Sequence, residues 1–132
     1  MKYQIRQFLA QGSPGAIVNV GSVSSFRPQP SNSAYVTAKH GVIGLTKTGS
    51  IEYAGQGIRV NAVLPGAIDT PMLRGALEST GFTEQDFAPA LSLFGRFGRP
   101  EEVGEASAWL CSDAASYVTG HSLAVEAGYL TR

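Results

Sequence analysis

Two short apolar segments, separated by a longer mixed one, constrain the fold of this chain more than any other feature. Residues 17–20 are rich in β-branched side chains and stop at Gly21, and residues 58–64 run directly into Pro65 and Gly66. Continuous apolar runs of this length are typical of parallel strands that are buried on both faces and joined by a helix. The sequence therefore predicts an α/β fold with functional residues at the carboxyl ends of its strands.

The segment between the two strands carries a tyrosine and a lysine one helical turn apart. A Ser-Asn-Ser stretch that ends at Ser33 offers an N-cap, so we expect a helix over residues 33–54. Tyr35 and Lys39, at positions i and i+4, then share one face of that helix. Ser22 lies thirteen positions before Tyr35, where the first strand ends. We therefore expect a hydroxyl, a phenol and an ammonium group near one end of the sheet.

These three groups suit proton transfer to or from an oxygen atom. A phenol has an unperturbed pKa near 10, so it is a poor acid or base at neutral pH unless a cation stabilises the phenolate. Lys39 can supply that charge, and Ser22 can hydrogen-bond the oxygen that Tyr35 protonates. The alternative is chance, because in a chain with five tyrosines a Y-x-x-x-K pair arises in roughly one chain in three of this size.

The order of the motifs resembles that of the short-chain dehydrogenase/reductase family. The run I-V-N-V-G-S is followed after thirteen residues by Y-x-x-x-K, and then by R-V-N-A-V-x-P-G-x-x-x-T-P-M. Residues 95–103 and 116–120 also look like the C-terminal region of that family. The resemblance covers essentially the whole chain, and the joint spacing is far more specific than any single motif.

The resemblance implies an oxidoreductase that interconverts an alcohol and a ketone by hydride transfer with NAD or NADP. It gives Tyr35 the role of general acid/base and Ser22 that of orienting the reacting oxygen. It implies that Lys39 lowers the pKa of Tyr35 and contacts the nicotinamide ribose. It also implies a small alcohol or ketone substrate and a dimer or tetramer of identical chains. The cofactor-binding residues that it implies are Tyr35, Lys39, Pro65, Gly66, Ile68 and Thr70.

We expect one domain over residues 1–132, with the architecture of the C-terminal half of a doubly wound parallel, Rossmann-like sheet. About three parallel strands are expected near residues 15–21, 57–64 and 121–126, with helices near 2–11, 33–54 and 100–112. The less regular residues 71–98 are interpreted as a lid of short helices over the substrate. An ordinary surface excursion is the alternative for this segment.

The expected helix over residues 33–54 contains three glycines, although glycine is unfavourable inside a helix. Gly41, Gly44 and Gly49 each cost up to about 1 kcal/mol there, so another element should approach closely. Glycine spacing does not distinguish packing on the chain's own sheet from packing in a subunit interface. We expect the apolar side of this helix to consist of Ala34, Ala38, Val42 and Leu45.

The chain holds no Gly-rich turn for a pyrophosphate and no selector for an adenosine ribose. In the family these elements precede the part that this chain resembles, so we expect an N-terminally truncated domain. Two functional classes stay open: a catalytic half, or an inactive fragment that acts only as an oligomerisation or interaction module. The first strand would carry an unpaired apolar edge, which invites association.

Composition argues against several other classes. The formal net charge is zero and 43% of the residues are hydrophobic, which indicates no nucleic-acid partner, no membrane-binding face and no disorder. No apolar run approaches membrane-spanning length. Cys111 is the single cysteine, which excludes a disulfide within the chain and suits a cytoplasmic location. No metal site is expected, because His40 and His121 have no ligand-type neighbours.

Overall fold

A three-stranded parallel sheet in the order β1-β2-β3 forms the centre of the computed structural model, which describes residues 1–132. The strands are β1 (Gly15–Val20), β2 (Ile58–Pro65) and β3 (Ser122–Val125). β2 pairs with both neighbours, so one edge of β1 and one edge of β3 have no partner strand. The predicted α/β fold with three parallel strands is confirmed.

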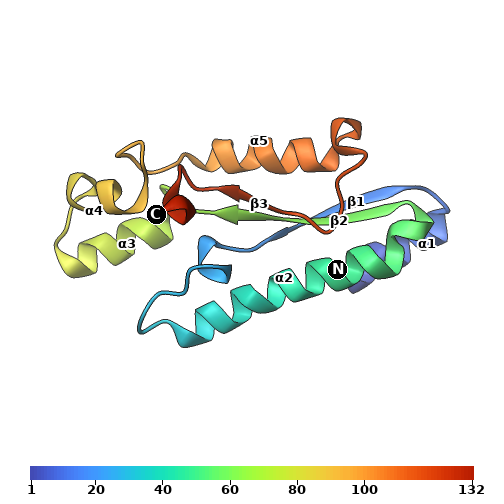
Figure 1. The fold of residues 1–132 in the computed structure, drawn as a ribbon, viewed down its shortest axis with the longest axis horizontal. Helices are drawn as coiled ribbons and strands as arrows, with labels where there is room; N and C mark the ends of the chain where they lie inside the picture. The colour runs from blue at the N-terminus through green and yellow to red at the C-terminus, as the bar shows by residue number, and fades with distance from the viewer.

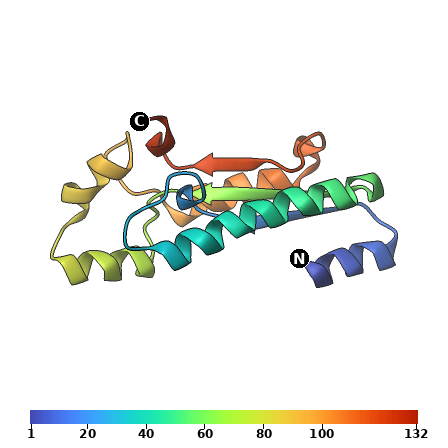
Figure 2. The same cartoon turned by 60° about the horizontal axis from the view of Figure 1, so that its bottom comes forward.

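Helices cover both faces of this sheet, as a doubly wound arrangement requires. Figure 1 shows α5 above the strands and α2 below them. In Figures 1 and 2, α3 and α4 lie beyond the ends toward which the strand arrows point. The helices are α1 (Lys2–Gln11), α2 (Ser33–Tyr53), α3 (Pro71–Thr80), α4 (Glu84–Leu91) and α5 (Pro100–Cys111).

Alternate residues of β2 hold the two layers on either side of the sheet together. On one face, Ile58 and Val60 are fully buried in a cluster with Ile5 of α1, and Leu64 packs against Ile43 of α2. Burying an aliphatic side chain of this size stabilises the folded chain by about 1.5–3 kcal/mol. The period of two along a strand sends the intervening residues to the opposite face.

The opposite face of β2 carries polar side chains that fasten the C-terminal part of the chain. Arg59 donates from Nη1 to the carbonyl oxygen of Leu110 at 2.7 Å and from Nη2 to that of Ser112 at 3.0 Å. These carbonyls belong to the last turn of α5 and to its C-cap, where backbone acceptors have no partner within the helix. One arginine on β2 therefore positions α5 on the sheet.

The side of α2 that faces the sheet is not the apolar side of Ala34, Ala38, Val42 and Leu45. Its buried residues include Ile43, Thr46 and Gly49, whereas Leu45 is exposed. The buried Thr46 accepts a hydrogen bond from Asn19 of β1 at 3.0 Å. Because the buried side of α2 contains small and polar residues, the spacing of apolar residues in the sequence does not identify it.

The three glycines of α2 have different explanations in the structure. A Cβ atom on Gly49 would lie 3.0 Å from the Cε of Met1, so close packing within the chain accounts for that glycine. A Cβ atom on Gly41 or Gly44 would meet nothing within 4 Å. Only Gly49 therefore packs closely against another part of this chain.

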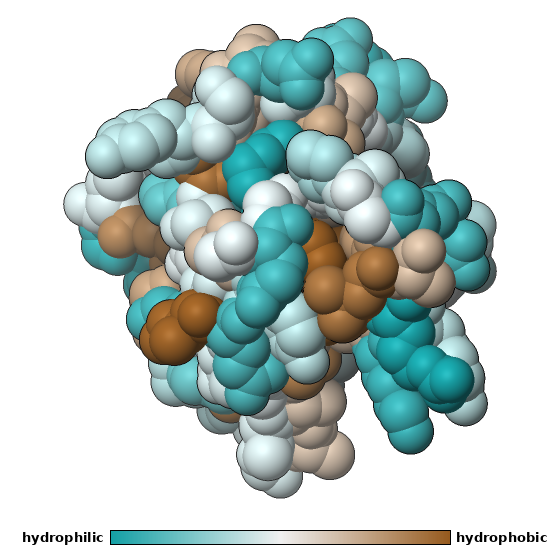
Figure 3. Space-filling view, turned by 90° about the vertical axis from the view of Figure 1, so that its right-hand side faces the viewer, coloured by the Kyte–Doolittle hydropathy of each residue, from teal (hydrophilic) through white to brown (hydrophobic).

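The end of the molecule where the strands begin offers no continuous apolar face. Figure 3 shows this end, where hydrophilic and weakly polar residues cover most of the surface and hydrophobic ones form separate spots. None of the helices combines the length and the apolar character that spanning a bilayer demands. In open parallel α/β sheets, ligands bind at the carboxyl ends of the strands.

Candidate active site

A cleft of about 930 Å³ lies at the carboxyl ends of β1 and β2. Its second wall comes from α3 and α4, which contribute side chains such as Leu73, Leu77 and Phe87. The structure brings every residue predicted for the site to this one cleft: Ser22, Tyr35, Lys39, Pro65, Gly66, Ile68 and Thr70. Neighbouring parallel strands share one carboxyl edge, which explains why residues distant in sequence meet there.

Ser22 is held in place by the turn that follows β1. It is the N-cap of the 3₁₀ turn η1 (Val23–Ser25), and its Oγ accepts a hydrogen bond from the backbone N–H of Ser24 at 3.1 Å. The residue is buried, yet its hydroxyl proton is donated to no group of the chain. A serine hydroxyl can donate while it accepts, so Ser22 is free to donate to an oxygen in the cleft.

Tyr35 and Lys39 lie in the first turns of α2. Asn32 occupies the N-cap position, but no cap residue makes the expected side-chain hydrogen bond. Tyr35 as a whole residue is 36% exposed, and its hydroxyl bonds to no group of the chain. Lys39 donates from Nζ to the carbonyl oxygen of Val20 at 3.0 Å, and the same nitrogen lies 5.5 Å from the centre of the Tyr35 ring. An ammonium group with two spare protons thus stands beside a free phenol.

The turn after β2 brings backbone close to both the cleft and β3. A Cβ atom on Gly66 would lie 2.9 Å from the Cα of Glu126, so only glycine fits there without a shift of backbone. Gly66 also donates its N–H to the carbonyl oxygen of Val125 at 3.0 Å. The N–H of Ile68 makes no hydrogen bond within the chain, although the residue lines the cleft. The N–H groups of Ala67 and Thr70, which also line the cleft, make none either, so this turn presents three free backbone donors.

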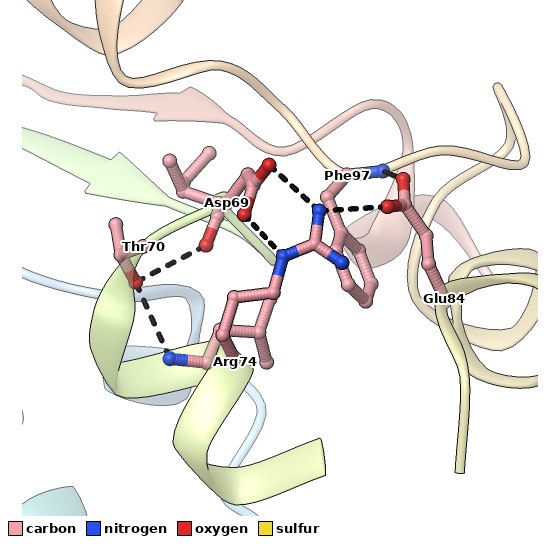
Figure 4. Close-up of polar contacts among 7 residues, drawn as sticks. Asp69, Thr70, Arg74, Glu84 and Phe97 are labelled. Carbon is pink, nitrogen blue, oxygen red and sulfur yellow. Dashed lines mark hydrogen bonds and ion pairs between the residues drawn. The ribbon is translucent and has the colours of Figure 1, made fainter. Parts of the chain in front are cut away.

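Thr70 serves as the helix cap of α3. Its Oγ1 accepts from the N–H of Leu73 at 3.4 Å and donates to the carbonyl oxygen of Ile68 at 3.3 Å. Both contacts are drawn in Figure 4. If Thr70 also binds the cofactor, as predicted, its hydroxyl does so while it caps the start of α3.

One arginine ties the predicted lid to the turn after β2 (Figure 4). Arg74 of α3 pairs with Asp69 at 2.6 Å and with Glu84 of α4 at 3.0 Å. Glu84 in turn accepts from the backbone N–H of Phe97 at 3.0 Å. The hydrogen bonds from Arg74 hold the pKa of the Asp69 carboxyl below its ordinary value. Sequence reasoning missed this cluster, because its members come from three separate segments.

The electrostatics of the cleft favour a neutral or anionic guest. Lys39 is the only charged residue that lines it, and the wall formed by α3 and α4 is largely apolar. No group of three or more His, Cys, Asp or Glu side chains is placed to hold a metal ion. The cleft therefore combines a polar end, at Ser22, Tyr35 and Lys39, with an apolar body.

Three further residues of the cleft were missed by the sequence argument. Gln29 and Asn32 line it from the loop before α2, and Tyr129 lines it from the 3₁₀ turn η4 (Tyr129–Thr131) after β3. Figure 2 shows the C-terminal segment turning back at the strand ends. No periodic pattern in the sequence predicts this return, because Tyr129 lies after the last strand.

A family model and several known proteins are similar in sequence to this chain. Residues 1–130 match a family model described as Enoyl-(Acyl carrier protein) reductase. A short chain dehydrogenase/reductase, astE, of Aspergillus oryzae is 45% identical over 97% of the chain and 49% of its own length. A 2,5-dichloro-2,5-cyclohexadiene-1,4-diol dehydrogenase of Sphingobium indicum is 44% identical over 98% of the chain and 51% of its length. Cis-4-hydroxycyclohexanecarboxylate dehydrogenase of Sinomonas cyclohexanicum is 48% identical over 97% of the chain and 49% of its own length.

Solved structures share the fold. ElxO with NADP bound superposes with a TM-score of 0.89 at 33% identity, over all of this chain and 52% of its own. A 4-hydroxyisoleucine dehydrogenase complexed with NADH gives a TM-score of 0.82 at 30% identity, over 99% of this chain and 53% of its own. The chain thus spans about half the length of the proteins that it matches.

Proposed function

Because the chain belongs to the short-chain dehydrogenase/reductase family, we propose that its cleft interconverts an alcohol and a ketone with NAD or NADP. One observation carries the proposal. The free hydroxyls of Ser22 and Tyr35 and the ammonium group of Lys39 line the same cleft at the carboxyl ends of β1 and β2.

The residues around the polar end fit a nicotinamide riboside. Lys39 keeps two ammonium protons for ribose hydroxyls, and Tyr35 lies beside it. The unbonded N–H of Ile68 suits a carboxamide oxygen, and Pro65 and Gly66 shape the same wall. When bound, the cofactor supplies a hydride to the substrate carbon or accepts one from it. The similar structures hold NADP in one case and NADH in another, and either cofactor is compatible with these residues.

In this proposal Tyr35 moves the proton. During reduction its hydroxyl gives a proton to the carbonyl oxygen while the carbonyl carbon gains the hydride, and the oxidation of an alcohol reverses both transfers. Ser22 donates a hydrogen bond to the same oxygen, which stabilises the negative charge that develops there. Lys39 supplies positive charge beside the phenol as its proton leaves.

The substrate class that we propose is a small ring alcohol or its ketone. The wall of α3 and α4 offers apolar side chains to a hydrocarbon ring. Two relatives are named for dehydrogenation of six-membered ring alcohols, one of them a diol and the other a carboxylate. Lys39, the only charged residue of the cleft, would supply a cation for a substrate carboxylate. Residues 71–98 act as the lid over this ring, with Arg74 joining α3 to α4.

The chain on its own lacks part of what a dinucleotide needs. Contacts to the pyrophosphate and to the adenosine are absent from its residues, and charge-assisted hydrogen bonds of that kind contribute about 1.5–3 kcal/mol each. Losing several of them weakens binding by several powers of ten. We therefore propose that the 132 residues act as a catalytic half, and that hydride transfer needs the part that the longer relatives add.

A second candidate is an association module without chemistry. The outward side of α2 favours it, because Gly41 and Gly44 leave that side open to a close neighbour. The unpaired edge of β1 is a further place for association. In the enzyme, the same surfaces would serve a dimer or tetramer of identical chains.

A chimera separates the two candidates. The half of cis-4-hydroxycyclohexanecarboxylate dehydrogenase that this chain does not cover is joined before Met1, and the purified chimera is compared with the 132-residue chain. We expect the chimera to bind a nicotinamide dinucleotide and to reduce the cofactor with cis-4-hydroxycyclohexanecarboxylate, and the chain alone to do neither. A folded chimera that binds no dinucleotide would favour the association module.

A further inference from the structure

Tyr129 is a buried residue with an unused polar group. Only 8% of the residue is exposed, and it lines the cleft from the turn after β3. Its hydroxyl bonds to no group of the chain. Among the side-chain oxygen and nitrogen atoms that are shielded from solvent, only the Ser122 oxygen lacks a hydrogen-bond partner. The unbonded Tyr129 oxygen is therefore not shielded from solvent. Tyr129 thus combines a place in the cleft wall with a hydroxyl that has no partner in the chain and is not sealed from solvent.

The Tyr129 ring is fixed before any ligand arrives. The guanidinium carbon of Arg27 lies 4.6 Å from the ring centre. Arg27 also donates to the carbonyl oxygens of Tyr129 at 3.0 Å and Arg132 at 2.8 Å. A carboxylate oxygen of Glu126 accepts from the N–H of Leu130 at 2.8 Å, which anchors the same turn. A rigid group of this kind loses little freedom when it binds a ligand.

A mostly buried phenol without a partner costs stability unless its hydroxyl meets water or a ligand. The reacting oxygen of the substrate already has partners in Ser22 and Tyr35. We infer that the Tyr129 hydroxyl hydrogen-bonds a second oxygen substituent of the substrate, and that the cleft prefers ring alcohols that carry one. This inference rests on the proposed function for the kind of molecule that enters the cleft.

A binding experiment on the full chain tests the inference with two probes, cyclohexane-1,4-diol and cyclohexanol. Each is titrated into ¹⁵N-labelled protein, and dissociation constants are taken from the amide shifts. The ratio of the two constants isolates the second hydroxyl, because both probes share the ring and the first hydroxyl. Tyr129→Phe keeps the ring over Arg27 and removes only the phenol oxygen. Tyr117→Phe, at a fully exposed tyrosine, is the matched control.

We expect the preference for the diol to fall by about two- to tenfold in Tyr129→Phe, as the loss of one neutral hydrogen bond predicts, and to be unchanged in Tyr117→Phe. Nuclear Overhauser contacts between the bound diol and the Tyr129 ring should appear in the wild-type chain, so the test survives a variant that fails to fold. An equal preference in wild type and Tyr129→Phe would overturn the inference.

A folded wild-type chain that shows no saturable binding of either probe would overturn it as well. So would amide shifts confined to residues away from the cleft. Because the readout is binding, it does not depend on hydride transfer. A chimera without turnover would therefore count against the proposed function and leave this result standing.

Discussion

Asn61 is the side chain whose removal should cost this fold the most for its size. It is 1% exposed, and it donates from Nδ2 to the carbonyl oxygen of Val118 at 2.9 Å. Its Oδ1 accepts from the N–H of His121 at 3.0 Å. The two bonds fix the entry of β3 into the sheet. In Asn61→Ala the Val118 carbonyl oxygen keeps only the 3.4 Å bond from Arg59, and the N–H of the exposed His121 is left to water.

Each lost hydrogen bond contributes about 0.5–1.5 kcal/mol, so Asn61→Ala should lower the free energy of unfolding by about 1–3 kcal/mol. Urea unfolding followed by far-ultraviolet circular dichroism measures the change. Asn32→Ala is the control, because that side chain is exposed and makes no cap bond, and it should change stability by less than about 0.5 kcal/mol. A loss in Asn61→Ala no larger than that in Asn32→Ala would refute the argument from the two lost hydrogen bonds.

Three further predictions concern the C-terminal part of the chain. Gly66→Ala should lower the free energy of unfolding by about 1–3 kcal/mol, because the new methyl group overlaps the backbone of Glu126. Ala127→Gly should raise it by up to about 1 kcal/mol in the same assay, because Ala127 has a φ of 49°. Hydrogen bonds from Arg96 lower the pKa of Glu102 from 4.5 to about 2. The stability advantage of wild type over Glu102→Gln should therefore be full above pH 4.5 and should vanish as the pH falls through about 2.

The sheet and the convergence of the site were predictable from local sequence. Residues 17–20 and 58–64 are short, mainly apolar runs that stop at Gly21 and at Pro65-Gly66, a pattern that fits buried parallel strands. Once these strands are parallel, Ser22 and the residues after Pro65 must share one edge. The catalytic and cofactor roles, the cytoplasmic location and the oligomeric state stay predictions.

Tertiary contacts decide the features that the sequence did not reveal. The buried side of α2 includes Thr46 and Gly49, which no apolar pattern marks as core. The Arg74 cluster joins residues from three segments, and Tyr129 reaches the cleft only because the C-terminal turn folds back. Each of these depends on where other elements lie, so local propensity carries no signal for it.

The most direct test of the central claim is single-turnover deuteride transfer in the chimera. Reduced cofactor deuterated at the nicotinamide is mixed with 4-oxocyclohexanecarboxylate and enzyme, and deuterated alcohol is counted in wild type, Tyr35→Phe and the exposed control Tyr117→Phe. The account predicts a rate about 10²–10⁴-fold lower in Tyr35→Phe with the fold intact, and a wild-type rate in Tyr117→Phe. Deuteride transfer at the wild-type rate by folded Tyr35→Phe would contradict it.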